Sequence, residues 1–189
     1  MEDLQGLPAS EARRFRSGRI CIDLVHTGGE DDLARWELLH TEKDVAQWLG
    51  RMTGAALTAG PGDVAATRAL RAAVWEATSA RAAGREPPAG AVAAINAAAA
   101  EPPLTPRLDG DGRAELAPGT AAQARSTLAH DAIDLLGGPL GHRIRVCAAG
   151  DCGLLFVDAS RPGRRRWCSM EWCGNRAKMR ARSGARRGG

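Results

Sequence analysis

Four of the five cysteines in this 189-residue chain lie within 27 residues near its C-terminal end. They form two pairs with equal spacing, Cys147-x4-Cys152 and Cys168-x4-Cys173, separated by fifteen residues. Two close pairs joined by a spacer are typical of a tetrahedral structural zinc site, in which each pair comes from a tight turn. Four thiolates close the coordination shell, so the pattern predicts one structural Zn²⁺ ion without a catalytic water. A disulfide pairing and an iron–sulfur cluster are the alternatives for the same cysteines.

The residues around the two pairs predict a small module of treble-clef type. The segment 143–146 alternates polar and apolar residues and favours a strand, and 154–157 favours the returning strand. A basic loop follows at 160–166, and a helix is expected to start at Cys173. A module of this size cannot bury a sufficient core, so metal binding is expected to supply most of its folding energy.

The first 139 residues favour a mostly helical domain. Thr41 and Thr120 have the pattern of helix N-caps, and Asp63 is expected to cap a longer helix. Apolar spacing and helix-stop residues place helices at about 41–53, 63–84, 92–101 and 120–136. The apolar run at 20–27 is too short for its periodicity to decide between a strand and a buried helix, and we favour the helix. The Asp-Gly-Asp-Gly run at 109–112 predicts a β-hairpin. The expected fold is therefore α+β and mostly α, with a helical domain over 1–139, a four-cysteine finger over 140–183 and a basic tail over 184–189.

Charge is distributed unevenly along the chain, whose net charge is +4. Residues 140–189 hold twelve Lys and Arg residues against three acids, a net charge of +9, and the remaining residues carry −5. A basic segment attached to an acidic body indicates a polyanionic partner, and a merely solubilising tail is the alternative. The candidate nucleic-acid contacts are Arg164, Arg165, Arg166, Asn175, Arg176, Lys178, Arg180 and Arg182. Asn175 could instead bond the second cysteine turn, and Arg176 could pair with Asp158.

The sequence over about 146–182 resembles the CGNR zinc finger. The resemblance is carried by the Arg-Arg-Trp-Cys-Ser-Met run that ends at Met170 and by Cys173-Gly174-Asn175-Arg176. That finger usually follows an N-terminal ABATE domain in bacterial proteins described as stress-induced transcription regulators. The run 21–27 (CIDLVHT) is similar to the Leu-Asp-Phe-x-Asn-Thr stretch of that domain, with His26 where the family commonly has Asn. The resemblance implies a zinc-bound DNA-binding finger and a domain that senses a signal or ligand.

Aromatic and histidine side chains in the first domain form a candidate ligand pocket. These residues are His26, Trp36, Trp48 and Trp75. Indole and imidazole rings together suit a small polar or aromatic ligand. The alternative is that these are ordinary core and surface residues.

Several function classes are disfavoured by the sequence. No apolar run approaches the roughly 20 residues that span a bilayer, and the acidic start of the chain lacks the apolar region of a secretory signal, so we expect a cytoplasmic protein. No nucleophile–base pair is visible, which argues against an enzyme. The hypothesis is a transcriptional regulator that binds double-stranded DNA, responds to a small-molecule inducer and forms a homodimer. An RNA-binding or ribosome-associated protein and a redox-sensitive interaction module are the alternatives.

Overall fold

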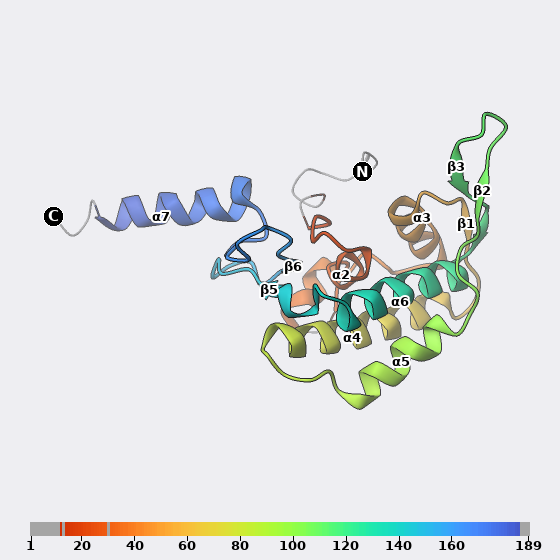
Figure 1. The fold of residues 1–189 in the computed structure, drawn as a ribbon, viewed down its shortest axis with the longest axis horizontal. Helices are drawn as coiled ribbons and strands as arrows, with labels where there is room; N and C mark the ends of the chain where they lie inside the picture. Colours follow the sequence, from red (N-terminus) through yellow and green to blue (C-terminus); the bar gives the residue numbers. More distant parts are fainter. Residues whose placement is uncertain (1–11, 13, 30, 186–189) are drawn as a thin grey trace.

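The chain folds into a helical body from which a C-terminal helix extends (Figure 1). The computed structural model describes residues 12, 14–29 and 31–185. Its helices are α2 (Ile20–Val25), α3 (Glu42–Thr53), α4 (Asp63–Ala82), α5 (Ala89–Ala99), α6 (Ala121–Gly137) and α7 (Asn175–Ala185). Short 3₁₀ segments lie at Asp31–Trp36 and Gly141–Arg143, and a π-helical turn spans Met170–Gly174. The helices predicted from the sequence are confirmed, including the short one at Ile20–Val25.

Local capping chemistry explains where the longer helices begin. The Thr41 hydroxyl accepts the Asp44 amide at 3.2 Å, and the Asp44 carboxylate accepts the Thr41 amide at 2.8 Å. Thr120 forms the same reciprocal box with Gln123 at the start of α6. Such boxes satisfy amide groups that the first helical turn leaves without partners. Both threonine caps are therefore confirmed.

Asp63 does not cap α4 as the sequence suggested. The cap position belongs to Gly62, whose φ is +90°, and Asp63 is the first helical residue. The Asp63 carboxylate instead accepts the Gly60 amide at 2.8 Å and pairs with Arg125 of α6 at 2.6 Å. Its acidic position in the first turn still complements the helix dipole, because that end of a helix carries partial positive charge.

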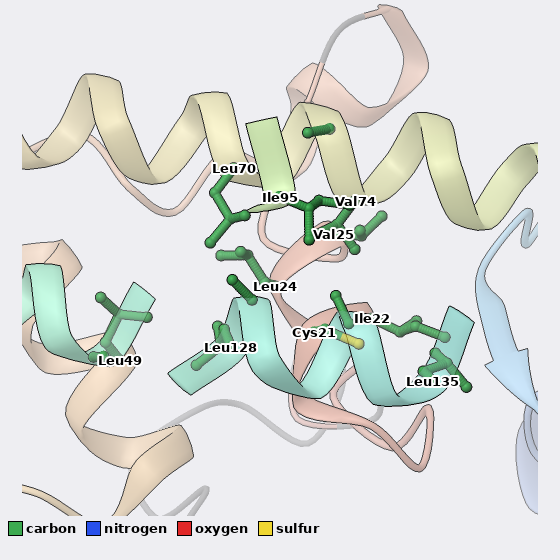
Figure 2. Packing of buried hydrophobic residues seen from close by; sticks show 14 of the residues in the cluster. Cys21, Ile22, Leu24, Val25, Leu49, Leu70, Val74, Ile95, Leu128 and Leu135 are labelled. Atoms are coloured by element: carbon green, nitrogen blue, oxygen red, sulfur yellow. The ribbon is translucent and has the colours of Figure 1, made fainter. Parts of the chain in front are cut away.

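The core lies where α2 crosses between α4 and α6. Figure 2 shows the side chains of Ile22, Leu24 and Val25 directed into this space, and all three are buried. Cys21 is also fully buried in this core. Burial raises the pKa of the Cys21 thiol well above its ordinary value, because the low-dielectric core disfavours the thiolate. Cys21 is therefore a packing residue.

Strands are short and lie at the periphery of the helical body. β2 (Pro106–Leu108) and β3 (Ala114–Leu116) pair antiparallel, which confirms the predicted hairpin. β1 (Leu57–Thr58) and β4 (Gly119–Thr120) form a parallel pair that the sequence analysis missed. A strand of two residues is too short to show periodicity, so the sequence could not predict this pair. The pair forms because the fold brings the chain after α3 beside the chain before α6.

The strands β5 (Ile144–Val146) and β6 (Leu155–Val157) join the helical body to the cysteine cluster. They pair antiparallel, with Ile144 opposite Val157 and Val146 opposite Leu155. Leu155 and Val157 belong to the main core, whereas Phe156 packs with Cys147 and Cys173. Side chains alternate between the two faces of a strand, so β6 supplies both clusters at once. The cysteine cluster is thus attached to the body through a buried strand.

Within the described ranges, no helix combines the length and the apolar character that crossing a bilayer requires.

Candidate metal centre

The four predicted cysteine ligands converge on one point. Their sulfur atoms all lie within 4.8 Å of one another. The Cys152–Cys168 and Cys168–Cys173 sulfur pairs are both 3.7 Å apart. A Zn–S bond of about 2.3 Å in a tetrahedral site requires sulfur–sulfur edges of about 3.8 Å. The donor set and its dimensions therefore fit one structural zinc ion held by Cys147, Cys152, Cys168 and Cys173.

Tight turns place the two pairs of sulfur atoms. The Cys152 amide donates to the Ala149 carbonyl at 3.0 Å and closes the first turn. The Cys168 amide donates to the Cys147 sulfur at 3.4 Å, which places the start of the second cysteine pair next to the first pair. Cys173 lies in the π-helical turn that leads directly into α7. Metal binding at Cys173 would therefore fix the first turn of α7.

Electrostatics in the cluster favour a bound cation. The neighbouring thiols of Cys152 and Cys168, together with the Cys168 amide, hold the pKa of Cys147 well below its ordinary value. Proximity to Cys147 raises the pKa values of Cys152 and Cys168 in turn. Four thiolates at this distance repel one another, so all four can deprotonate together only around a cation. Zn²⁺ leaves a formal charge of −2, and the Arg176 guanidinium, 3.5 Å from the Cys173 sulfur, offsets part of it.

Comparison with known families agrees with this geometry. Residues 18–139 match the ABATE family, which is described as "putative stress-induced transcription regulator". The chain belongs to the ABATE family. Residues 143–187 match the CGNR zinc finger, so the four-cysteine cluster lies within a recognised zinc-binding region. Both are regulator and zinc-finger families rather than enzyme families. No curated protein matches the chain.

Asp151 organises two of the basic side chains of the CGNR finger. Its carboxylate pairs with Arg176 at 3.1 Å and with Arg180 at 2.7 Å, one turn further along α7. These cations lower the pKa of Asp151, since they favour its charged form. Asp151 was not among the sequence candidates, because the acid lies in the first cysteine turn and the arginines lie some 25 residues later. Only the metal-centred fold brings them together.

The partner expected for Arg176 in the alternative interpretation is wrong. Asp158 does not pair with Arg176 but accepts the Ser160 hydroxyl at 2.6 Å and the Arg165 amide at 2.9 Å. It therefore closes the basic loop between β6 and the second cysteine pair. Asn175 does bond the cysteine turn, as that interpretation proposed, by donating to the Glu171 carbonyl at 3.1 Å.

Arg165 differs from its two neighbours in the basic loop. Its Nε donates to the Trp167 carbonyl at 2.9 Å, its Nη2 donates to the Cys168 carbonyl, and its guanidinium lies 4.8 Å from the centre of the Phe156 ring. Arg164 and Arg166 are exposed. Arg165 is thus built into the finger, whereas the charges of its neighbours face solvent.

The other basic candidates lie on α7. Lys178 and Arg180 are exposed, and Arg176 is half-buried. For Arg182 the structure describes the backbone alone. Figure 1 shows α7 leading away from the helical body, and residues 178–180 on it are exposed.

Two of the four residues proposed for a ligand pocket line a cleft, and two do not. Trp36 and Trp75 face a cleft of about 860 Å³ between the ABATE region and the first cysteine turn. His26 is buried, with its Nδ1 2.7 Å from the Arg14 carbonyl. Trp48 is also buried and packs edge-on against Phe15, with ring centres 5.8 Å apart. Both side chains lie among the apolar residues of the main core rather than at the cleft. His26 and Trp48 are therefore core residues.

The cleft also contains residues that sequence reasoning missed. Arg71 lies on its wall, is almost fully buried, and holds Glu37 through two hydrogen bonds of 2.6 and 2.9 Å. Arg68, one turn earlier on α4, lies 3.7 Å from the same carboxylate. A cationic residue next to the apolar positions Leu70 and Val74 of α4 was the available signal, because a buried charge needs a partner.

Proposed function

We propose that this protein is a cytoplasmic transcriptional regulator whose zinc finger binds double-stranded DNA and whose ABATE region receives a signal. The observation that carries the proposal is α7, a basic helix that starts at a zinc ligand and extends from the body. Metal binding would fix one end of this helix and leave its charged sides accessible. The regulator and zinc-finger descriptions of the two matched families support the same function.

The exposed cations suit the DNA backbone. Arg164, Arg166 and Lys178 face solvent, and phosphate contacts of this kind supply most of the affinity of nonspecific DNA binding. Arg176 and Arg180 are held by Asp151, which orients their guanidinium groups for contact with phosphate or base edges. Arg165 is assigned to holding the finger together. A single small finger reads few base pairs, so we include a two-fold dimer on paired half-sites in the proposal.

The test is the salt dependence of binding to duplex DNA by the full zinc-loaded chain. Each phosphate neutralised contributes about −0.9 to the slope of log affinity against log salt concentration. Lys178→Gln should weaken binding and make the slope shallower by about 0.9. Arg51→Gln is the matched control, because Arg51 is exposed on α3, within the ABATE region. Its slope should equal that of the parent protein.

The same titration decides between nucleic-acid partners. A structured RNA competitor should displace the protein less effectively than duplex DNA at equal salt. Stronger competition by RNA would overturn the DNA assignment and favour an RNA-binding function. Equal slopes for Lys178→Gln and Arg51→Gln would remove α7 from the interface.

A further inference from the structure

The cleft between the ABATE region and the zinc finger has the size of a small-molecule site. One wall comes from Gly28, Gly29, the residues 33–37 and α4, and the other from the first cysteine turn, Gly150–Gly153. Its volume of about 860 Å³ lies within the 300–1,000 Å³ that ligand pockets usually span. The two walls belong to different matched families, so a ligand there would contact both parts of the chain.

Aromatic surface in the cleft favours a ligand with a flat ring. Trp36 and Trp75 both line it, and each indole is half-buried. The Arg35 guanidinium lies 4.7 Å from the centre of the Trp36 ring and adds a second flat surface at the same place. Rings stack on indole and guanidinium planes, and the energy gained does not require hydrogen bonding.

The charges in the cleft favour an anion. Three acids line the cleft, Glu37, Glu76 and Asp151. Glu37 is held by Arg71, and Asp151 by Arg176 and Arg180, so the lining cations Arg35 and Arg68 outnumber the remaining acid, Glu76. Arg68 differs: the distance of 3.7 Å from Glu37 is too long for a hydrogen bond. This Nε forms only an ion pair with Glu37, and 41% of the Arg68 side chain remains exposed. The exposed end of the Arg68 guanidinium can therefore donate charge-assisted hydrogen bonds to a ligand carboxylate.

The cleft reaches the metal centre directly. Trp36, Asp151 and Cys152 line the cleft and also line a smaller gap of about 30 Å³ beside the thiols of Cys168 and Cys173. A ligand that contacts these three residues therefore touches a zinc ligand and the acid that holds two arginines of α7. The cleft and the finger are therefore connected by direct contact through these residues.

We propose that this cleft binds a small organic anion with a flat ring and that the bound ligand holds the first cysteine turn against the ABATE region. The ring packs against the indoles of Trp36 and Trp75, and Arg68 receives the carboxylate. This inference deepens the sensing part of the proposed function and rests on it. Because a ligand that bridges both walls stabilises the closed arrangement, zinc should leave the finger more slowly when the cleft is filled.

The first experiment measures binding to the full zinc-loaded chain by NMR. The probes are benzoate, 2-naphthoate and indole-3-acetate, with 2-naphthamide as the neutral analogue and 2-naphthylmethylamine as the cationic one. At least one acid should saturably shift the indole signals of Trp36 and Trp75 and the amide signals of Gly150 and Gly153. Arg68→Gln should bind that acid about tenfold more weakly, as expected for the loss of a charge-assisted hydrogen bond.

Two matched variants separate filling of the cleft from general damage. Ala72 is exposed on α4 and lines the cleft, so Ala72→Phe should abolish binding. Ala66→Phe places the same side chain at an exposed position of α4 outside the cleft and should bind as the parent does. Absence of saturable shifts with all three acids at millimolar concentration would overturn the proposal. Equal binding of the amine would overturn the assignment of an anion.

The second measurement is the transfer of zinc to an excess of a chromophoric chelator. With the acid present at ten times its dissociation constant, transfer should slow by about tenfold if release requires the cleft to open. Ala72→Phe should show no effect of the acid. Equal transfer rates with and without bound acid would refute the coupling. Neither measurement contains DNA, so both results stand apart from the test of DNA binding.

Discussion

Asp23 in α2 and His26, the residue that caps the C-terminal end of α2, are both buried, and burial moves their pKa values in opposite directions. Desolvation lowers the pKa of His26 to about 4 from 6.5, because its ring is enclosed in the core. Desolvation also raises the pKa of Asp23 to about 6 from 3.8. His26 therefore stabilises the fold above pH 6.5, and this contribution is lost as the pH falls towards 4. Asp23 stabilises it below pH 3.8, and this contribution is lost as the pH rises towards 6.

The two contributions should largely cancel in the parent protein between pH 4 and 6. His26→Asn keeps a donor for the Arg14 carbonyl but removes the titration, so its unfolding free energy should rise as the pH falls from 6 to 4. Asp23→Asn should show the reverse slope. Each slope is at most about 1.4 kcal/mol per pH unit.

Urea unfolding of the three proteins at pH 4, 5, 6 and 7 checks this prediction. All three keep the four cysteines, so acid-induced loss of zinc affects each alike and cancels in the comparison. Parallel pH profiles for the parent and both variants would contradict the assigned direction of both pKa shifts.

At the scale of elements, β6 is the joint between the two parts of the molecule. Leu155 and Val157 pack into the helical core, and Phe156 packs under the zinc centre. Phe156 and Leu155 are fully buried, although they are adjacent in sequence. Substitutions at neighbouring positions should therefore affect different parts of the protein.

Phe156→Ala and Leu155→Ala test this division. Each removes a large buried side chain, at a cost of about 3–4 kcal/mol. Phe156→Ala should speed zinc transfer to a chelator more than tenfold. Leu155→Ala should mainly lower the urea midpoint of the helical signal measured by circular dichroism. If both variants changed the rate of zinc transfer and the urea midpoint in the same proportion, the side chains of β6 would not be divided between two cores.

Local signals made much of the fold predictable at this scale. The capping boxes at Thr41 and Thr120 and the hairpin turn at 109–112 lie within a few neighbouring residues, and the structure confirms them. The four cysteine ligands were predictable because their spacing reflects the geometry of one ion. The cleft was not, since Gly28, Gly29 and the segments 33–37, 68–76 and 150–153 form it together. Its surfaces carry no sequence pattern that shows which of them meet.

At the scale of the whole molecule, charge and shape separate the two ends of the chain. The basic residues are concentrated after residue 140, where the net charge is +9, and the rest carries −5. Under the proposed function, the acidic body would repel DNA and the basic finger would attract it, which favours an approach led by α7. The buried cluster of the finger is small and consists of Phe156, Cys147, Ala149 and Cys173. A cluster of this size supplies little folding free energy, so we expect the finger to depend on its metal for stability.

The most direct test of a zinc-dependent DNA interface is to measure duplex DNA affinity while zinc is returned stepwise to metal-free, reduced protein. Affinity should rise in proportion to bound zinc and reach its plateau at one ion per chain, because the ion fixes the first turn of α7 at Cys173. Equal affinity with and without zinc, or a rise that continues beyond one ion per chain, would contradict the account.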